Sequence, residues 1–167
     1  MIAKTSARWG ILLGLALVTG TQILTWAGLG LTNWFIFLTY FWVILFMILA
    51  FRDLKAKNEG KLIFKNVLLP IVIIVLISRL IFQIYMFIYI NYVDPTWVET
   101  VAESWTQTMT ETGVDAETIE KRIQFFRNAY VTQRMFTTEL IAVGIPQMVL
   151  GIIVSLFFVL KRKKSEA

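Results

Sequence analysis

Long apolar stretches alternate with polar segments along this chain. The apolar stretches cover residues 9–31, 34–51, 67–90 and 136–160. Each holds about the 20 residues that a helix needs to cross roughly 30 Å of hydrocarbon. The stretches are continuous and lack the alternation of membrane β-barrel strands. The pattern predicts an all-α fold: an integral membrane four-helix bundle in a single domain over residues 1–167, with an extramembrane helical hairpin between the third and fourth spans.

The polar segment between the last two spans, residues 91–135, has a helical pattern of its own. Asp94 and Pro95 are typical of a helix start, with the aspartate as the cap and the proline at the first helical position. Thr112 and Gly113 predict the end of this helix. Between them an apolar stripe recurs at every fourth position, consisting of Trp97, Val101, Trp105 and Met109.

A second amphipathic helix is predicted after this one. Asp115 can cap it, and its apolar face consists of Ile119, Ile123, Phe126 and Tyr130. Since neither Gly nor Pro intervenes before Gly144, we expect the helix to continue without a break into the fourth span. The apolar faces allow two compatible interpretations: they pack against each other in a hairpin, or they dock a protein partner or lipid headgroups.

Composition supports a bilayer environment. Of the 167 residues, 57% are hydrophobic and only 16% are charged, against about 25% charged in ordinary soluble proteins. The sequence has no Cys and no His, which excludes thiolate and imidazole metal sites, disulfides and nucleophile–histidine catalytic pairs. We therefore expect no cofactor, no metal and no enzymatic activity. The net charge of +5 lies beside the apolar stretches, which indicates membrane topology and not nucleic-acid binding.

The charged residues are distributed unevenly between the two sides that four spans would create. The N-terminal tail, the link 52–65 and the C-terminal tail together hold 11 cations and three anions. Residues 91–135 hold four cations and seven anions. The positive-inside rule then places both termini in the cytoplasm and residues 91–135 on the opposite side of the membrane.

Arg79 lies near the middle of the third span, where an arginine costs about 2.5–3.5 kcal/mol on insertion scales. Polar residues at a compatible depth are Gln83, Glu139, Gln147 and Gln22. We expect the guanidinium to point into the bundle and to bond Glu139, Gln147 or both. Two interpretations remain open: a buried polar pair that fixes helix register, or a cavity that binds an anionic group such as a lipid phosphate.

Small residues indicate where helices approach each other. Gly10 and Gly14 form a G-x-x-x-G pair in the first span, and Gly151 and Ser155 have the same spacing in the fourth. We favour packing within the chain over dimerisation. Pro146 predicts a kink in the fourth span.

Three short segments resemble those of a bacterial family. They read Lys4-Thr5-Ser6-Ala7-Arg8-Trp9-Gly10, Phe51-Arg52-Asp53 and Tyr89-Ile90-Asn91-Tyr92-Val93-Asp94-Pro95. With the acidic residues 111–117 and the lysine-rich tail, they make the chain similar over nearly its whole length to the family catalogued as domain of unknown function 4199. The resemblance implies a four-span bacterial inner-membrane protein without an assigned catalytic residue, and Arg79 departs from the family's usual third span. Genes of this kind lie near membrane glycosyltransferases, so the resemblance also implies an accessory role in envelope glycan or lipid metabolism.

These expectations favour a small multi-pass inner-membrane protein that is a non-enzymatic accessory or scaffold subunit of a membrane complex. With cytoplasmic termini, residues 91–135 would be periplasmic. The alternative is a small oligomeric transporter, channel or lipid-binding protein that uses the polar residues around Arg79. The expected partners are membrane lipids and either another membrane protein or further copies of the chain.

Overall fold

A computed structural model describes residues 2–27, 33–58, 65–130, 134, 137–138 and 140–160. Nearly all of these residues are helical, and none of them forms a strand. The chain divides into two compact units, Met1–Phe82 with Leu140–Ala167, and Gln83–Glu139. We call the helices of the first unit the bundle, and the two amphipathic helices of the second unit the hairpin.

Four helices are long and apolar enough to cross a membrane. They are α1 (Ile2–Trp26), α2 (Asn33–Lys57), α3 (Lys65–Ile88) and α7 (Ile145–Leu160). Two five-residue π-helical segments adjoin them, η1 (Tyr89–Val93) after α3 and η2 (Leu140–Gly144) before α7. The predicted all-α, multi-pass membrane fold is therefore confirmed, and the first helix begins seven residues earlier than the apolar stretch does.

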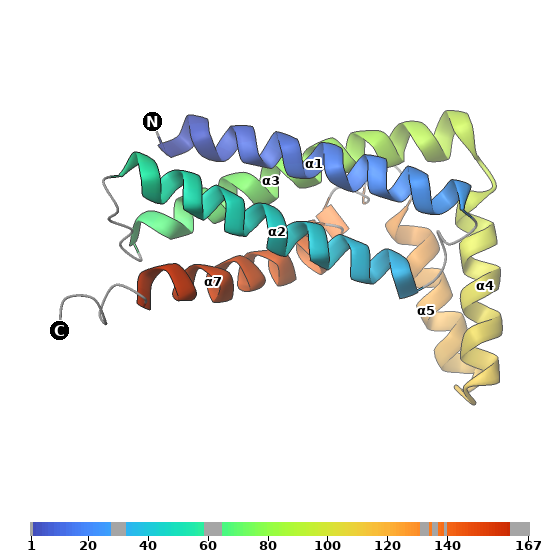
Figure 1. Ribbon diagram of the computed structural model, residues 1–167. Coiled ribbons are helices and arrows are strands. Elements are labelled where there is room, and N and C mark those ends of the chain that lie inside the picture. The colour runs from blue at the N-terminus through green and yellow to red at the C-terminus, as the bar shows by residue number, and fades with distance from the viewer. Residues whose placement is uncertain are drawn as a thin grey trace. The chain divides into compact units, whose positions relative to one another are not determined.

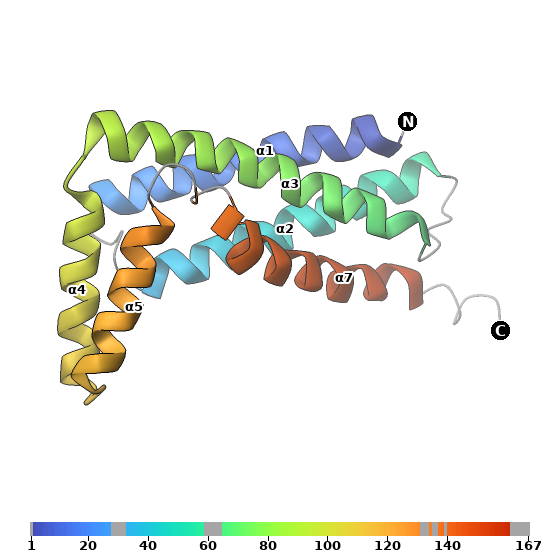
Figure 2. The same ribbon diagram turned by 180° about the vertical axis from the view of Figure 1, so that it is seen from behind.

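The bundle helices alternate in direction, as Figures 1 and 2 show. The Trp9 indole near the start of α1 donates a hydrogen bond to Asp53 near the end of α2, so these two helices are antiparallel. Phe51 of α2 packs on Phe158 of α7 with ring centroids 5.8 Å apart, so the ends of these helices coincide. The starts of α1 and α3 and the ends of α2 and α7 consequently lie at one end of the bundle.

Glycines let the bundle backbones approach closely. A Cβ added at Gly14 of α1 would lie 2.9 Å from the Cβ of Ile81 in α3, and one added at Gly10 would lie 2.9 Å from that of Ile77. Gly151 of α7 meets Ile71 of α3 in the same way. The small-residue pairs therefore pack within the chain.

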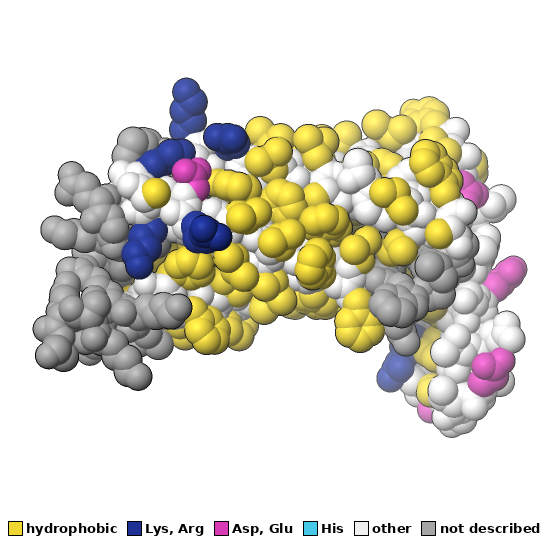
Figure 3. All heavy atoms as spheres, viewed as in Figure 1, with side chains coloured by type: hydrophobic (Ala, Val, Ile, Leu, Met, Phe, Trp, Pro, Cys, Tyr) yellow, Lys and Arg dark blue, Asp and Glu magenta, His cyan; other side chains and the backbone are white. Residues whose placement is uncertain are grey.

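The apolar surface of the bundle suits a lipid environment. Exposed side chains on all four helices are mainly large and apolar, including Leu15, Phe41, Leu69, Leu80 and Phe157. Figure 3 shows hydrophobic side chains covering the α1–α2 face, with Lys and Arg side chains gathered at one end of it. An exposed apolar surface of this extent is typical of a protein solvated by hydrocarbon.

The hairpin consists of α4 (Trp97–Glu111) and α5 (Ala116–Ala129). Its core contains Val101 and Ala102 of α4 with Ile119, Ile123 and Phe126 of α5. Gly113 adopts a φ of +76°, a conformation that glycine adopts without steric cost. There the amides of Gly113 and Val114 donate to the carbonyls of Thr110 and Met109, the pattern that closes a helix in a Schellman motif. The predicted end of the first helix is confirmed.

Two boundary predictions in this region are wrong. The helix cap of α4 is Thr96, not Asp94, because the Asp94 carboxylate instead accepts hydrogen bonds from the Thr96 amide and hydroxyl in a turn before the helix. The second helix ends at Ala129 and does not continue unbroken towards Gly144. Tyr130, Val131 and Thr132 follow it in the sequence, and aromatic and β-branched residues propagate a helix poorly.

Candidate functional site

Arg79 lies in the interior of the bundle with 4% of its surface exposed. Its Nε donates a hydrogen bond of 2.9 Å to Oε1 of Gln147, which is fully buried on α7. This is one of the bonds that the sequence predicts. Because hydrocarbon offers a guanidinium no acceptor, the side chain of α3 turns inward to an amide oxygen of another helix.

The surroundings of the guanidinium combine apolar and polar groups. Its Cζ lies 5.4 Å from the ring centroid of Phe82, a distance at which the face of an aromatic ring attracts a cation. Ser78 is also buried, and its hydroxyl donates a hydrogen bond to the Val75 carbonyl within α3. Nε2 of Gln147 is buried without a hydrogen-bond partner among the described residues. The site therefore holds one positive charge and at least one unused donor in a buried interior.

The remaining predicted members of this polar cluster have different positions. Gln83 lies one turn after Arg79 in α3, and its amide is buried without a hydrogen-bond partner in the part of the chain that is described. Gln22 lies in α1 and is partly buried. Glu139 lies outside the described residues. The structure thus brings Arg79 and Gln147 together, while an anion-binding role for the set stays a prediction.

The apolar stripe of α4, formed by Trp97, Val101, Trp105 and Met109, faces α5 along most of its length. Val101 is buried, and Trp97 and Met109 pack against the same core. Trp105 packs on Phe126 with tilted rings whose centroids lie 4.8 Å apart, and it still keeps 45% of its surface exposed. Three of the four stripe residues are therefore engaged in packing within the hairpin. Trp105 is the one that keeps a large exposed surface, which is available for docking.

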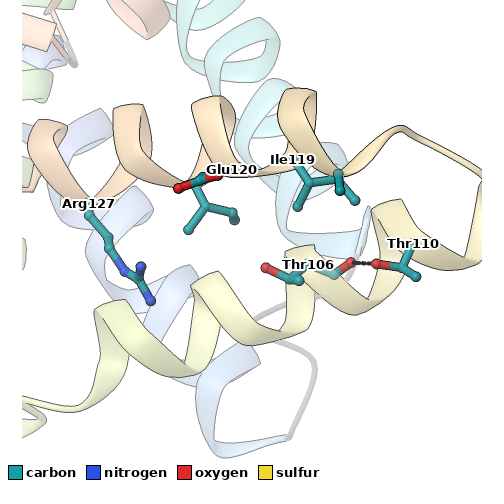
Figure 4. A pocket seen from close by; sticks show the side chains of 7 residues that line it. Thr106, Thr110, Ile119, Glu120 and Arg127 are labelled. Atoms are coloured by element: carbon teal, nitrogen blue, oxygen red, sulfur yellow. Dashed lines mark hydrogen bonds between the residues drawn. The ribbon is translucent and has the colours of Figure 1, made fainter.

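A groove of about 340 Å³ runs between the two hairpin helices. Figure 4 shows Thr106 and Thr110 of α4 opposite Ile119 and Glu120 of α5. Arg127 closes one end and forms an ion pair with Glu99 of α4, its Nη2 lying 2.5 Å from Oε2. The groove has an apolar floor, a hydroxyl wall and charges of both signs, but among the described residues no group of acidic side chains could hold a metal ion.

The Asp115 carboxylate caps α5 at the turn of the hairpin. It accepts a hydrogen bond of 2.8 Å from the Thr118 amide, as the capping prediction required. Hydrogen bonding from Thr118 lowers the pKa of this carboxyl below its ordinary value, since the bonds favour the charged form.

The sequence interpretation missed one polar cluster, at the basic end of the bundle. Asp53 accepts hydrogen bonds from the Trp9 indole (3.0 Å) and the Lys57 ammonium (3.1 Å). Lys57 also donates to the Thr5 hydroxyl. The signal was present, because two of the segments that carry the family resemblance contain Thr5, Trp9 and Asp53. Their contact could not be read from the sequence, since 44 positions separate Trp9 from Asp53.

Comparison with known proteins gives a family but no function. The family model described as "Protein of unknown function (DUF4199)" matches residues 8–159, so the chain belongs to this family. No curated protein and no solved structure matches the chain.

Proposed function

We propose that this DUF4199 member is a non-enzymatic accessory or scaffold subunit of a complex in the bacterial inner membrane. In this proposal both termini are cytoplasmic, the hairpin is periplasmic, and the complex acts in envelope glycan or lipid metabolism. The observation that supports it best is the self-contained core of the hairpin. A loop that only connected two spans would not need a buried cluster, a capped second helix and a Schellman turn.

The outer surface of the hairpin offers features suited to a protein partner. Trp105 is 45% exposed, and its ring packs against that of Phe126. Phe125, on α5, is 66% exposed. Rigid, half-exposed aromatic residues are the typical energetic centres of protein interfaces, because they bury a large area at a low entropic cost. The hairpin as a whole carries an excess of acidic residues, which would favour a partner with a basic surface.

The proposed orientation follows from the grouping of basic residues. Lys4 and Arg8 lie at the start of α1, and Arg52, Lys55 and Lys57 lie at the end of α2. The Lys57–Thr5 contact joins these two ends. A cation excess at one end of a multi-pass bundle is the signal that fixes cytoplasmic orientation.

Cysteine labelling tests the orientation, because the sequence contains no Cys that would interfere. We expect a membrane-impermeant maleimide to label Gln107→Cys in intact spheroplasts and to label Ala56→Cys only after lysis. Both positions are exposed at the surface. Labelling of Ala56→Cys alone in intact spheroplasts would contradict the proposed topology.

Quantitative co-purification in mild detergent tests the accessory role. The double substitution Trp105→Ala with Phe125→Ala should reduce recovery of a specific partner at least tenfold while leaving the bundle intact. The matched control is Phe157→Ala, which removes an equally exposed ring from α7. Recovery of no partner at all, or equal recovery with both variants, would contradict docking through the hairpin.

A second candidate function, binding of an anionic lipid group inside the bundle, is supported by the buried and unused Nε2 donor of Gln147 beside the charge of Arg79. In this alternative the protein is a lipid-binding protein, transporter or channel that works as a small oligomer. Gln147→Leu should then abolish retention of a phospholipid in native mass spectrometry. Unchanged lipid retention in a folded Gln147→Leu protein would leave only the structural role.

A further inference from the structure

The basic end of the bundle carries a surface patch of five cations on α1 and α2: Lys4, Arg8, Arg52, Lys55 and Lys57. Figure 3 shows Lys and Arg side chains surrounding an acidic one there, at the edge of the apolar surface. Within the described part of α1 and α2 the acid is Asp53, which is already engaged by Trp9 and Lys57. Lys4, Arg8, Arg52 and Lys55 form no salt bridge within the described residues.

An aromatic row extends from this patch into the apolar surface. The Trp9 ring packs edge-on against Phe46 with centroids 6.1 Å apart, and Phe46 packs on Trp42 at 5.8 Å. All three rings are partly exposed on the same two helices. Cations that border an apolar surface, with an indole at the boundary, match the amphiphilic structure of a phospholipid, whose phosphate lies at the end of its acyl chains.

We propose that this patch binds the headgroup phosphate of an anionic phospholipid, with the acyl chains lying along Trp9, Phe46 and Trp42. Arg8 and Arg52 supply the principal charges, because arginine can hold a phosphate with two parallel hydrogen bonds. Asp53 acts as a positioning residue, because it joins α1 to α2 and forms a salt bridge with Lys57. The combined charge of the other four cations outweighs that of its carboxylate. The site does not depend on the hairpin or on any protein partner.

Lipid titration of the purified full-length protein tests this proposal. Phosphatidylglycerol added to phosphatidylcholine-saturated micelles at low salt should bind measurably in native mass spectrometry and raise the melting temperature. A cation near a membrane surface contributes roughly a fivefold gain in affinity, so Arg8→Gln with Arg52→Gln should weaken binding about 30-fold. Arg8→Lys with Arg52→Lys keeps the charge but loses the paired hydrogen bonds, so it should weaken binding less than the glutamine substitutions do, which separates loss of the charged site from loss of the fold.

The matched control removes two cations from the hairpin instead, with Lys121→Gln and Arg122→Gln, and should bind phosphatidylglycerol like the parent protein. If the glutamine substitutions in the patch and those in the hairpin weaken phosphatidylglycerol binding equally, the effect is one of general charge and the proposal is overturned. Equal binding of phosphatidylcholine and phosphatidylglycerol would also overturn it. Displacement of phosphatidylglycerol by millimolar inorganic phosphate, or by a polyglutamate peptide, would assign the patch to a soluble anion or an acidic protein and would equally reject a lipid site.

Discussion

The bundle and the hairpin both bury apolar side chains, but they differ in the other contacts that hold their helices together. In the bundle, Gly10, Gly14 and Gly151 bring backbones together, and a charged side chain bonds an amide between helices. In the hairpin, the interior consists of apolar side chains around Phe126, and the ion pair that joins the two helices, Arg127 with Glu99, lies at the surface.

The difference reflects the solvent of each region. In water, burying apolar area drives association, so a few large side chains hold two helices together. In hydrocarbon that force is absent between apolar surfaces, and close van der Waals packing and interhelical hydrogen bonds take its place. The bundle therefore adds close glycine contacts and an interhelical hydrogen bond to its buried apolar side chains, whereas the hairpin relies on apolar burial.

The largest expected effect is on the hairpin interior. Phe126→Ala should destabilise the hairpin by about 3–5 kcal/mol, since it removes a buried ring that Trp97, Trp105 and Tyr130 all contact. Hydrogen exchange of α4 and α5 amides measures the loss. Phe125→Ala, at the neighbouring exposed position, is the control and should cost little; similar losses for both would contradict the proposed core.

The next effect concerns the polar bond of the bundle. Gln147→Leu should destabilise the bundle by about 2–3 kcal/mol, because it removes an acceptor from a buried charge. Unfolding in mixed detergent measures this. Combining it with Arg79→Leu should recover part of the loss, since an apolar replacement of a whole buried pair is often neutral. Additive losses would show that the two residues act independently.

A smaller effect is expected where two bundle backbones meet. Gly14→Ala should destabilise the bundle by about 1–2 kcal/mol, because the new Cβ would lie 2.9 Å from that of Ile81 and the gain in helix propensity offsets only part of the strain. The same detergent unfolding applies. Leu15→Phe adds more volume at the next, lipid-facing position, and it should be near neutral. The opposite ranking would argue against the α1–α3 contact.

The smallest effect is pH dependence of the hairpin. Hydrogen bonding lowers the pKa of Asp115 in the folded state, so the stabilisation is present above the ordinary aspartate pKa of about 3.9 and is lost as the pH falls through the lowered value. Helicity measured by circular dichroism should decline in acid. Asp115→Asn keeps a capping oxygen and should remove this part of the pH dependence; an unchanged acid profile would assign it to other carboxyls.

Much of the fold could be predicted from periodicity and chain length. Four spans, the Gly113 turn and the Asp115 cap each depend on a local signal that a few residues carry. The start of α4 was less predictable, because an aspartate carboxylate can accept hydrogen bonds either as a helix cap or in a turn that precedes the helix, and Asp94 does the second. The end of α5 was missed because no Gly or Pro marks it.

The sites depended on contacts that the sequence does not encode locally. Arg79 could be identified because a charge in an apolar run needs a partner, and Gln147 was one of a few side chains at the right depth. The Trp9–Asp53 contact joins polar groups at two helix ends, where water would also satisfy them, so nothing in the sequence required them to meet.

The bond between Arg79 and Gln147 spans 68 positions, and this separation has a consequence for biosynthesis. At roughly 5–20 residues per second, the ribosome adds Gln147 about 3–14 s after Arg79. During these seconds the nascent third helix carries its arginine while that amide does not yet exist. It is the most apolar of the four candidate spans, and this surplus of hydrophobicity lets the insertion machinery accept a charged residue whose amide acceptor has yet to be synthesised.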